Sequence, residues 1–159
     1  NIPKGTFYLF YKSKELLLFD VIQEQHERVN QKLYQAISDV DGPSFSAEKL
    51  TDMIFEFYKM TEEMPIFRLM DSEEIELLVR KLPREVVEAH LQDDTDTIQK
   101  MFALLPVKKE VDVKVLSAAF HAIYYATLHK KEIGEEGYDQ ALRMLIYGVV
   151  TQIIDARES

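Results

Sequence analysis

Apolar residues recur at steps of three and four along most of the chain, which is the period of an amphipathic α-helix. In the longest such stretch, from Ser13 to Val40, six residues share one face of the predicted helix: Phe19, Ile22, His26, Val29, Leu33 and Ile37. Ser13 is the expected N-cap, and Gly42 and Pro43 follow as a stop signal. The pattern therefore predicts one long helix over residues 13–40.

Further helices are predicted downstream, separated by prolines, glycines and short polar segments. Their expected ranges are residues 46–64 (starting at Ser46 or Ala47), 66–70, 72–82, 83–105, 111–130 and 138–156. Ser72 is an expected N-cap, and Pro83 suits the first turn of a helix, where its missing N–H costs nothing. The sequence shows no period-two alternation and no internal repeat, so it predicts an all-α fold.

The last two predicted helices are apolar around more of their circumference than a single core requires. Residues 138–156 carry apolar side chains at positions 141, 142, 145, 146, 149, 150, 153 and 154. A helix of this kind is buried on two sides, by its own domain and by a second body. Alanines and a glycine leave room for close helix approach, so we expect a homodimer with a four-helix interface. The expected interface residues are Ala119, Ala122, Ala126, Leu142, Leu145, Gly148, Val149 and Gln152.

The composition indicates one sizeable core and excludes several kinds of chemistry. The chain has 159 residues, of which 47% are hydrophobic, and it has no cysteine. The absence of cysteine excludes disulfides, thiolate metal sites and cysteine nucleophiles. The longest apolar run, Met144 to Val150, is far shorter than the roughly 18 residues that a membrane span needs. We expect a soluble cytoplasmic protein with no membrane partner.

Charge is distributed unevenly along the chain. The net charge is −9, yet the first fourteen residues contain three lysines and no acidic residue. An acidic body repels phosphate backbones, so a polyanion would meet the protein at its basic N-terminal end. In a short helix over residues 3–11, Lys4 and Tyr8 share an exposed face, and Gly5 permits close approach. Such side chains suit phosphates and base edges, although a solvated basic tip is the plainer interpretation of the charge alone.

The segment IPKGTFYLFYKSKELLL (Ile2 to Leu18) resembles the second half of the helix-turn-helix of the tetracycline-repressor (TetR/AcrR) family of bacterial transcription regulators. The recognition helix in that family has a typical order of residues. It begins with a valine or isoleucine and a small residue or proline, often continues with lysine-glycine-threonine, and ends with an apolar residue and a tyrosine. An aromatic or histidine pair, a polar residue, serine or asparagine and lysine then lead into a connecting helix. Phe10 departs from the pattern, because histidine or tyrosine is common there. The resemblance implies DNA contacts by Lys4, Gly5, Thr6, Tyr8, Leu9, Phe10 and Lys14.

The resemblance also implies a division of the chain and a function. Residues 1–40 would hold the recognition helix and the connecting helix, and residues 41–159 the ligand-binding and dimerisation domain. A recognition helix needs earlier helices to hold it across the groove, so the chain is expected to lack the first part of its DNA-binding domain. The implied function is ligand-responsive regulation of transcription, by a repressor that a small apolar or amphipathic effector releases from double-stranded operator DNA.

A candidate effector pocket is suggested by the segment from Met53 to Met70, which holds four of the six methionines together with several aromatic residues. Flexible methionine side chains often line adaptable apolar sites, while ordinary core packing is the alternative for each residue. The family usually holds its effector within the helical body, near the corresponding helices. The predicted pocket residues are Tyr58, Met60, Met64, Phe67, Met101, Phe102, His121 and Tyr125, and no cofactor is expected.

The remaining polar residues show no pattern of catalysis or metal binding. His121 and His129 are about 80° apart around a helix, which is a poor arrangement for sharing a metal. The acidic clusters at residues 71–76 and 93–96 are expected to be solvated, and they lack calcium-loop spacing. Neither a metal site nor a catalytic residue is expected. Two other function classes stay open: an all-α interaction or ligand-binding module without DNA binding, and a disfavoured α-helical enzyme.

Overall fold

The computed structural model describes residues 10–40, 45–66, 70, 72–106 and 111–154. Within these ranges the chain forms helices and no strand, which confirms the predicted all-α fold. None of the described helices is long and apolar enough to span a membrane. In chain order the helices are α2 (Lys14–Ser38), α3 (Ala47–Glu62), α5 (Ser72–Lys81), α6 (Arg84–Phe102), α7 (Val113–Leu128), α8 (Lys130–Ile133) and α9 (Tyr138–Ile153).

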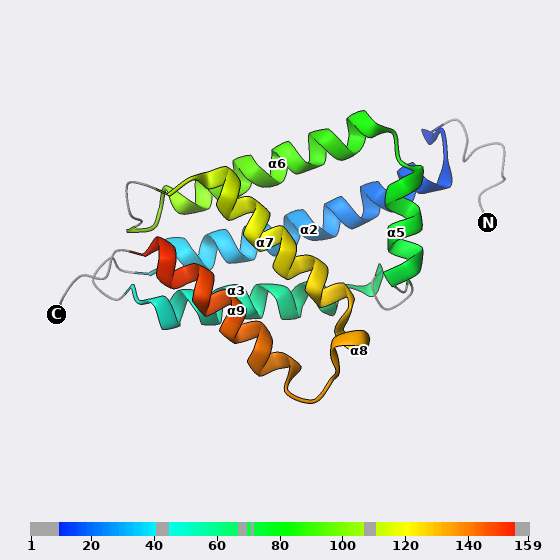
Figure 1. Ribbon diagram of the computed structural model, residues 1–159. Helices are drawn as coiled ribbons and strands as arrows, with labels where there is room; N and C mark the ends of the chain where they lie inside the picture. The colour runs from blue at the N-terminus through cyan, green and yellow to red at the C-terminus, as the bar shows by residue number, and fades with distance from the viewer. Residues whose placement is uncertain (1–9, 41–44, 67–69, 71, 107–110, 155–159) are drawn as a thin grey trace.

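The helices are arranged in two layers (Figure 1). Helices α7 and α9 cross in front of α2, α3 and α6, and α5 lies near the end where α2 begins. Direct packing joins α3 to both α2 and α9, α6 to α7, and α7 to α9. The core between these helices is apolar, and four side chains in it are at most 2% exposed: Leu50, Leu142, Ile146 and Val150.

Helix α2 follows the sequence prediction closely. Ser13 adopts an extended backbone conformation and its hydroxyl accepts a hydrogen bond from the N–H of Leu16 at 3.2 Å, so it is the N-cap. The helix ends at Ser38, and Gly42 and Pro43 lie outside the described residues. Of the six residues predicted to share a face, His26 is half-buried and the other five are buried: Phe19, Ile22, Val29, Leu33 and Ile37.

Helix α9 is docked along α3 by apolar packing and by polar contacts at the rim. The Arg143 guanidinium forms an ion pair with Asp52 and lies over the Phe55 ring, 3.8 Å from its centroid. The Tyr147 hydroxyl donates a hydrogen bond to Glu48 at 3.3 Å. Because one face of α9 is fixed against α3 in this way, the opposite face of α9 is turned away from the core.

Several helix boundaries differ from the prediction by one to three residues, and the differences in α3 and α6 have local reasons. Helix α3 ends at Glu62, two residues early, because its last turn tightens: the Met64 N–H bonds to the carbonyl of Thr61, three residues back, at 3.1 Å. Pro83 was predicted in the first turn of α6, but it is the N-cap residue and the helix begins at Arg84. Helix α6 ends at Phe102, not at residue 105, because the next turn tightens to hydrogen bonds three residues apart: Leu104 to Met101 and Leu105 to Phe102.

The connection from α7 to α9 contains a short helix that the sequence pattern did not reveal. Helix α7 starts after Asp112, whose carboxylate accepts the N–H of Lys114 at 2.9 Å. After α7 the chain forms the single turn of α8 and then reaches α9 through Gly134 and Gly137, whose φ angles are 106° and 76°. Only glycine adopts these angles at low cost, so the two glycines fix where α9 begins.

Candidate functional site

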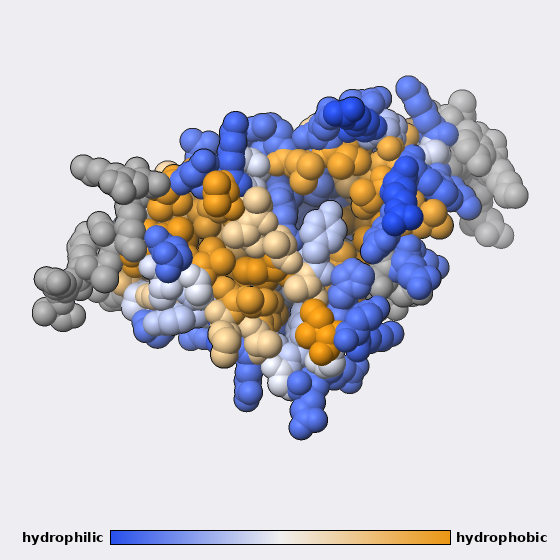
Figure 2. Space-filling view, viewed as in Figure 1, coloured by the Kyte–Doolittle hydropathy of each residue, from blue (hydrophilic) through white to orange (hydrophobic). Residues whose placement is uncertain are grey.

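A cavity of about 450 Å³ lies between α2, α3, α5, α6 and α7. Its volume is within the range of roughly 300–1,000 Å³ typical of small-molecule sites. Most of its lining is aliphatic or aromatic, with a few polar side chains on α2, α6 and α7. Figure 2 shows the face of the molecule hollowed between α6 and α7, where residues of both helices line the cavity.

Helix α2 forms one wall of this cavity along nearly its whole length. The apolar face predicted from the sequence is the face that lines it, and the contributing residues are Phe19, Ile22, His26, Asn30, Leu33 and Ile37. Opposite α2, the lining comes from α6 and α7, and α5 closes the end near the start of α2. A molecule in the cavity would therefore contact the helix that follows directly on the segment resembling a recognition helix.

Five of the eight predicted pocket residues line the cavity: Tyr58, Met101, Phe102, His121 and Tyr125. Met60 and Met64 do not, so this part of the prediction is wrong. Met60 is about 200° from Tyr58 around α3, since each helical residue turns about 100°. Met64 follows the end of α3 and is buried in a second apolar cluster, against which Met60 packs. Phe67 lies outside the described residues.

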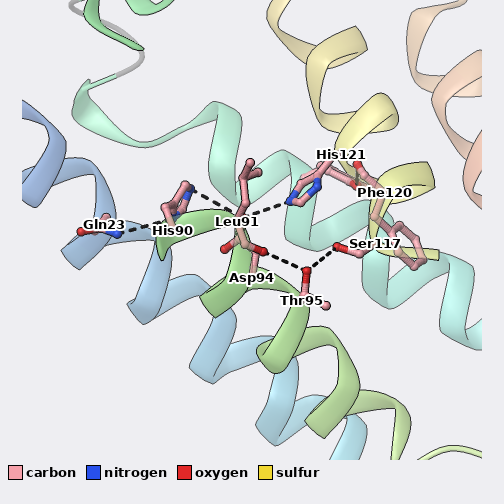
Figure 3. A network of polar contacts seen from close by, with 9 residues as sticks. Gln23, His90, Leu91, Asp94, Thr95, Ser117, Phe120 and His121 are labelled. Atoms are coloured by element: carbon pink, nitrogen blue, oxygen red, sulfur yellow. Dashed lines mark hydrogen bonds and ion pairs between the residues drawn. The ribbon is translucent and has the colours of Figure 1, made fainter. Parts of the chain in front are cut away.

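A polar cluster at the cavity wall is centred on Asp94 of α6 (Figure 3). Its Oδ2 atom is 3.1 Å from Nε2 of His121 on α7 and 3.5 Å from Nε2 of His90 on α6. The amide of Gln23 on α2 donates to Nδ1 of His90 at 3.4 Å, so the Nε2–H of His90 is the one directed at Asp94. The cluster therefore joins α2, α6 and α7 around one carboxylate.

Further hydrogen bonds hold α7 in place beside this cluster. The hydroxyls of Thr95 and Ser117 are 3.3 Å apart across α6 and α7, and Thr95 also donates to the carbonyl of Leu91 at 2.8 Å (Figure 3). From α3, the Tyr58 hydroxyl donates to the carbonyl of Phe120 at 2.8 Å. Burial raises the pKa of Tyr58 well above its ordinary value, so this phenol keeps its proton and its donor role.

Burial also fixes the charge state of two other lining residues. It lowers the pKa of His26 to about 4, with Asp94 opposing the shift and His90 adding to it. It raises the pKa of Tyr124, and the negative charge of Asp94 raises it further. The His26 and Tyr124 rings are in edge contact, with centroids 5.7 Å apart. Near neutral pH both side chains are therefore uncharged.

Several lining residues were not predicted from the sequence. Asp94 was expected to be solvated with its acidic neighbours, but its side chain is only 27% exposed, whereas Asp93 and Asp96 are exposed. The available signal was the four-residue spacing from His90 to Asp94, which places both on one helix face. His26 was predicted on the apolar face of α2 but not as a pocket residue. A histidine among the apolar residues of that face was the available signal for a polar group in the cavity lining.

Most of the predicted DNA-contacting residues cannot be placed. Lys4, Gly5, Thr6, Tyr8 and Leu9 lie outside the described residues. Phe10 is 78% exposed, and Lys14 is exposed at the first residue of α2. Contact with DNA therefore stays a prediction for all seven residues.

The predicted dimer-interface residues fall mainly on an apolar surface that the chain leaves open, the α7/α9 face. Ala122, Leu145, Gly148 and Gln152 are exposed, and Ala119, Ala126 and Val149 are half-buried. The prediction for Leu142 is wrong, because this side chain is 2% exposed and belongs to the chain's own core. The face also includes residues that were not predicted, notably Val115 and Met144, which are 66% and 75% exposed. Figure 2 shows apolar side chains gathered over α7 and α9.

Comparison with protein-family models, with curated proteins and with solved structures finds no match for this chain. Within the described ranges, no three histidine, aspartate or glutamate side chains are grouped so that they could hold a metal ion. The cavity with its Asp94 cluster and the α7/α9 face are thus the two features from which a function can be argued.

Proposed function

We propose that this chain is the ligand-binding and dimerisation part of a ligand-responsive transcription regulator, a homodimeric repressor that a small amphipathic effector releases from DNA. The observation that carries the proposal is the position of α2. Its apolar face lines the cavity, and its N-terminal end at Lys14 follows directly on the segment that resembles a recognition helix. One helix thus links the effector site to the expected DNA-binding end.

The dimensions of α2 suit this coupling role. At 25 residues it is about 37 Å long, given a rise of about 1.5 Å per residue. Two recognition helices must be about 34 Å apart, or a multiple of that, to enter successive major grooves on one side of the DNA. A tilt of α2 that accommodates an effector in the cavity would move its N-terminal end and change this spacing. The Gln23–His90 hydrogen bond, nine residues past Lys14, connects the movement to α6.

The α7/α9 face supports the dimeric part of the proposal. Large exposed apolar patches on a soluble chain commonly mark contact surfaces, and this face combines exposed Val115, Met144 and Leu145. Gly148 has nothing within 4 Å of the position where a Cβ would lie, so a partner helix could approach α9 closely there. A second copy related by a two-fold axis would pair the same four helices symmetrically.

The test is selection of duplex DNA from a random library by the full-length protein, followed by titration of the enriched sequence. Tyr8→Ala should weaken binding to the selected sequence by about 1–3 kcal/mol per half-site, because a base or nearby phosphate contact is lost. Lys14→Ala should weaken binding to all sequences and reduce its salt dependence. Failure to enrich any duplex, with ligand binding retained, would favour the ligand-binding module without DNA binding.

A further inference from the structure

We infer that the cavity binds an amphipathic cation, a molecule with an apolar body and a positively charged nitrogen that is held at Asp94. This inference rests on the effector site of the proposed function and specifies the chemical class of the effector. It is carried by the charges of the lining and by the position of Asp94 within it.

The lining contains one formally charged group among the described residues, the Asp94 carboxylate. No lysine or arginine of the described ranges lines the cavity, so an anionic ligand would find no permanent positive partner there. His26 faces the cavity as a neutral side chain, because burial lowers its pKa to about 4. The net charge of −9 also attracts cations to the surface and repels anions from it.

The geometry around Asp94 leaves an acceptor for the ligand. Among the described residues, the contacts from His90 and His121 are both made to Oδ2 of Asp94, at 3.5 and 3.1 Å. Oδ1 of the same carboxylate can therefore accept a hydrogen bond from an ammonium group. The aromatic rings of Tyr124 and Tyr125 also line the cavity, with centroids 6.2 Å apart, and the faces of such rings attract cations.

The cost of covering Asp94 distinguishes a cation from other ligands. Its side chain is 27% exposed, and a ligand that fills the cavity would remove much of its remaining water. Removing water from a carboxylate is unfavourable unless an opposite charge or new hydrogen bonds replace it. A neutral hydroxyl can replace only part of this hydration, with one hydrogen bond, and a carboxylate ligand adds like-charge repulsion, whereas an ammonium group supplies an opposite charge as well as hydrogen-bond donors.

The experiment compares decylamine, decanol and decanoate, which share an alkyl chain and differ in the charge of the head group. Each is titrated into the protein by isothermal calorimetry at pH of about 8, above the range in which histidine side chains ordinarily titrate. The same titrations are made with Asp94→Asn, which keeps the shape of the side chain and removes its charge. Asp93→Asn is the matched control, because it removes the same charge from an exposed neighbour on α6.

Decylamine should bind more tightly than decanol, and decanoate should bind least tightly. Asp94→Asn should weaken decylamine binding about tenfold or more, the loss expected for a hydrogen bond to a charged group, and Asp93→Asn should not. Equal or tighter binding of decanol or decanoate by the unmodified protein would overturn the inference, as would a preference for decylamine that survives in Asp94→Asn. If Asp94→Asn fails to fold, the three-ligand comparison still tests the preference for a cation, and its failure would still overturn the inference.

The result also separates this inference from the proposed function. If decanol binds as well as decylamine, the cavity is a ligand site without a preference for cations, and the proposed function is unaffected. If none of the three compounds binds, the inference fails, and the proposed function is judged separately by the DNA selection.

Discussion

Replacing His26 by leucine should remove a loss of stability that the unmodified protein undergoes in acid. The His26 imidazole on α2 contacts the rings of Tyr124 and His90, at centroid distances of 5.7 and 6.5 Å. Burial lowers its pKa from 6.5 to about 4, because a charged imidazole cannot keep its hydration there. The neutral imidazole is therefore favoured in the folded state relative to the unfolded state.

The direction and size of the effect follow from this shift. The stability contributed by neutral His26 is complete above the unfolded pKa of 6.5 and is lost as the pH falls through about 4. The free energy of unfolding should fall by about 2 kcal/mol by a pH of about 5, and by about 3 kcal/mol by a pH of about 4. This is a large part of the roughly 5–15 kcal/mol that stabilises a typical domain.

Urea unfolding followed by circular dichroism, at a series of pH values from about 7 to about 4, measures the effect. Carboxylates titrate in both proteins, so the difference between His26→Leu and the unmodified protein isolates the contribution of His26. His129→Leu is the control, because the His129 side chain is 40% exposed and does not line the cavity. A difference between His26→Leu and the unmodified protein that stays constant with pH would refute the reasoning.

Three further predictions concern the cavity, the dimer and a helix cap. Leu91→Trp should fill the cavity and abolish the thermal stabilisation that a bound ligand gives, as measured by scanning calorimetry. Leu77→Trp is the control and should keep this stabilisation, because Leu77 is also exposed but does not line the cavity. Leu145→Arg should convert a dimer into a monomer in light scattering, because the arginine would be buried without a partner in the interface. The monomer should stay folded, since Leu145 is 52% exposed in the single chain. A monomeric mass for the unmodified protein would disprove the interface. Asp112→Ala should lower the free energy of unfolding by about 1 kcal/mol through loss of the α7 N-cap, and an unchanged urea midpoint would contradict this.

The helices could be predicted from the sequence because their signals are local. The steps of three and four from Phe19 to Ile37 identify the buried face of α2, and Ser13 and Ser46 mark where α2 and α3 begin. The short α8 could not be predicted in this way, since a single turn carries too few residues for a periodic pattern.

The site was only partly predictable because it depends on which helix faces meet. Tyr58, His121 and Tyr125 were expected in the pocket and line the cavity, but Met60 and Met64 were assigned there from composition alone. A methionine-rich segment does not reveal the direction of each side chain, which depends on where α3 ends and how it is rotated. Asp94 was missed because its burial results from the approach of α7, about 27 residues away in the chain.

The central claim, that filling the cavity controls DNA binding through α2, is tested most directly by fluorescence anisotropy of a labelled duplex selected by the full-length protein. The tightest-binding of the three decyl compounds is added to the preformed complex. The account predicts that the ligand releases DNA at concentrations at or above the one that half-fills the cavity in calorimetry, because bound DNA weakens ligand binding by the same factor. Leu91→Trp should retain its DNA at the same concentrations. DNA that stays bound to the unmodified protein when the cavity is saturated would contradict the account.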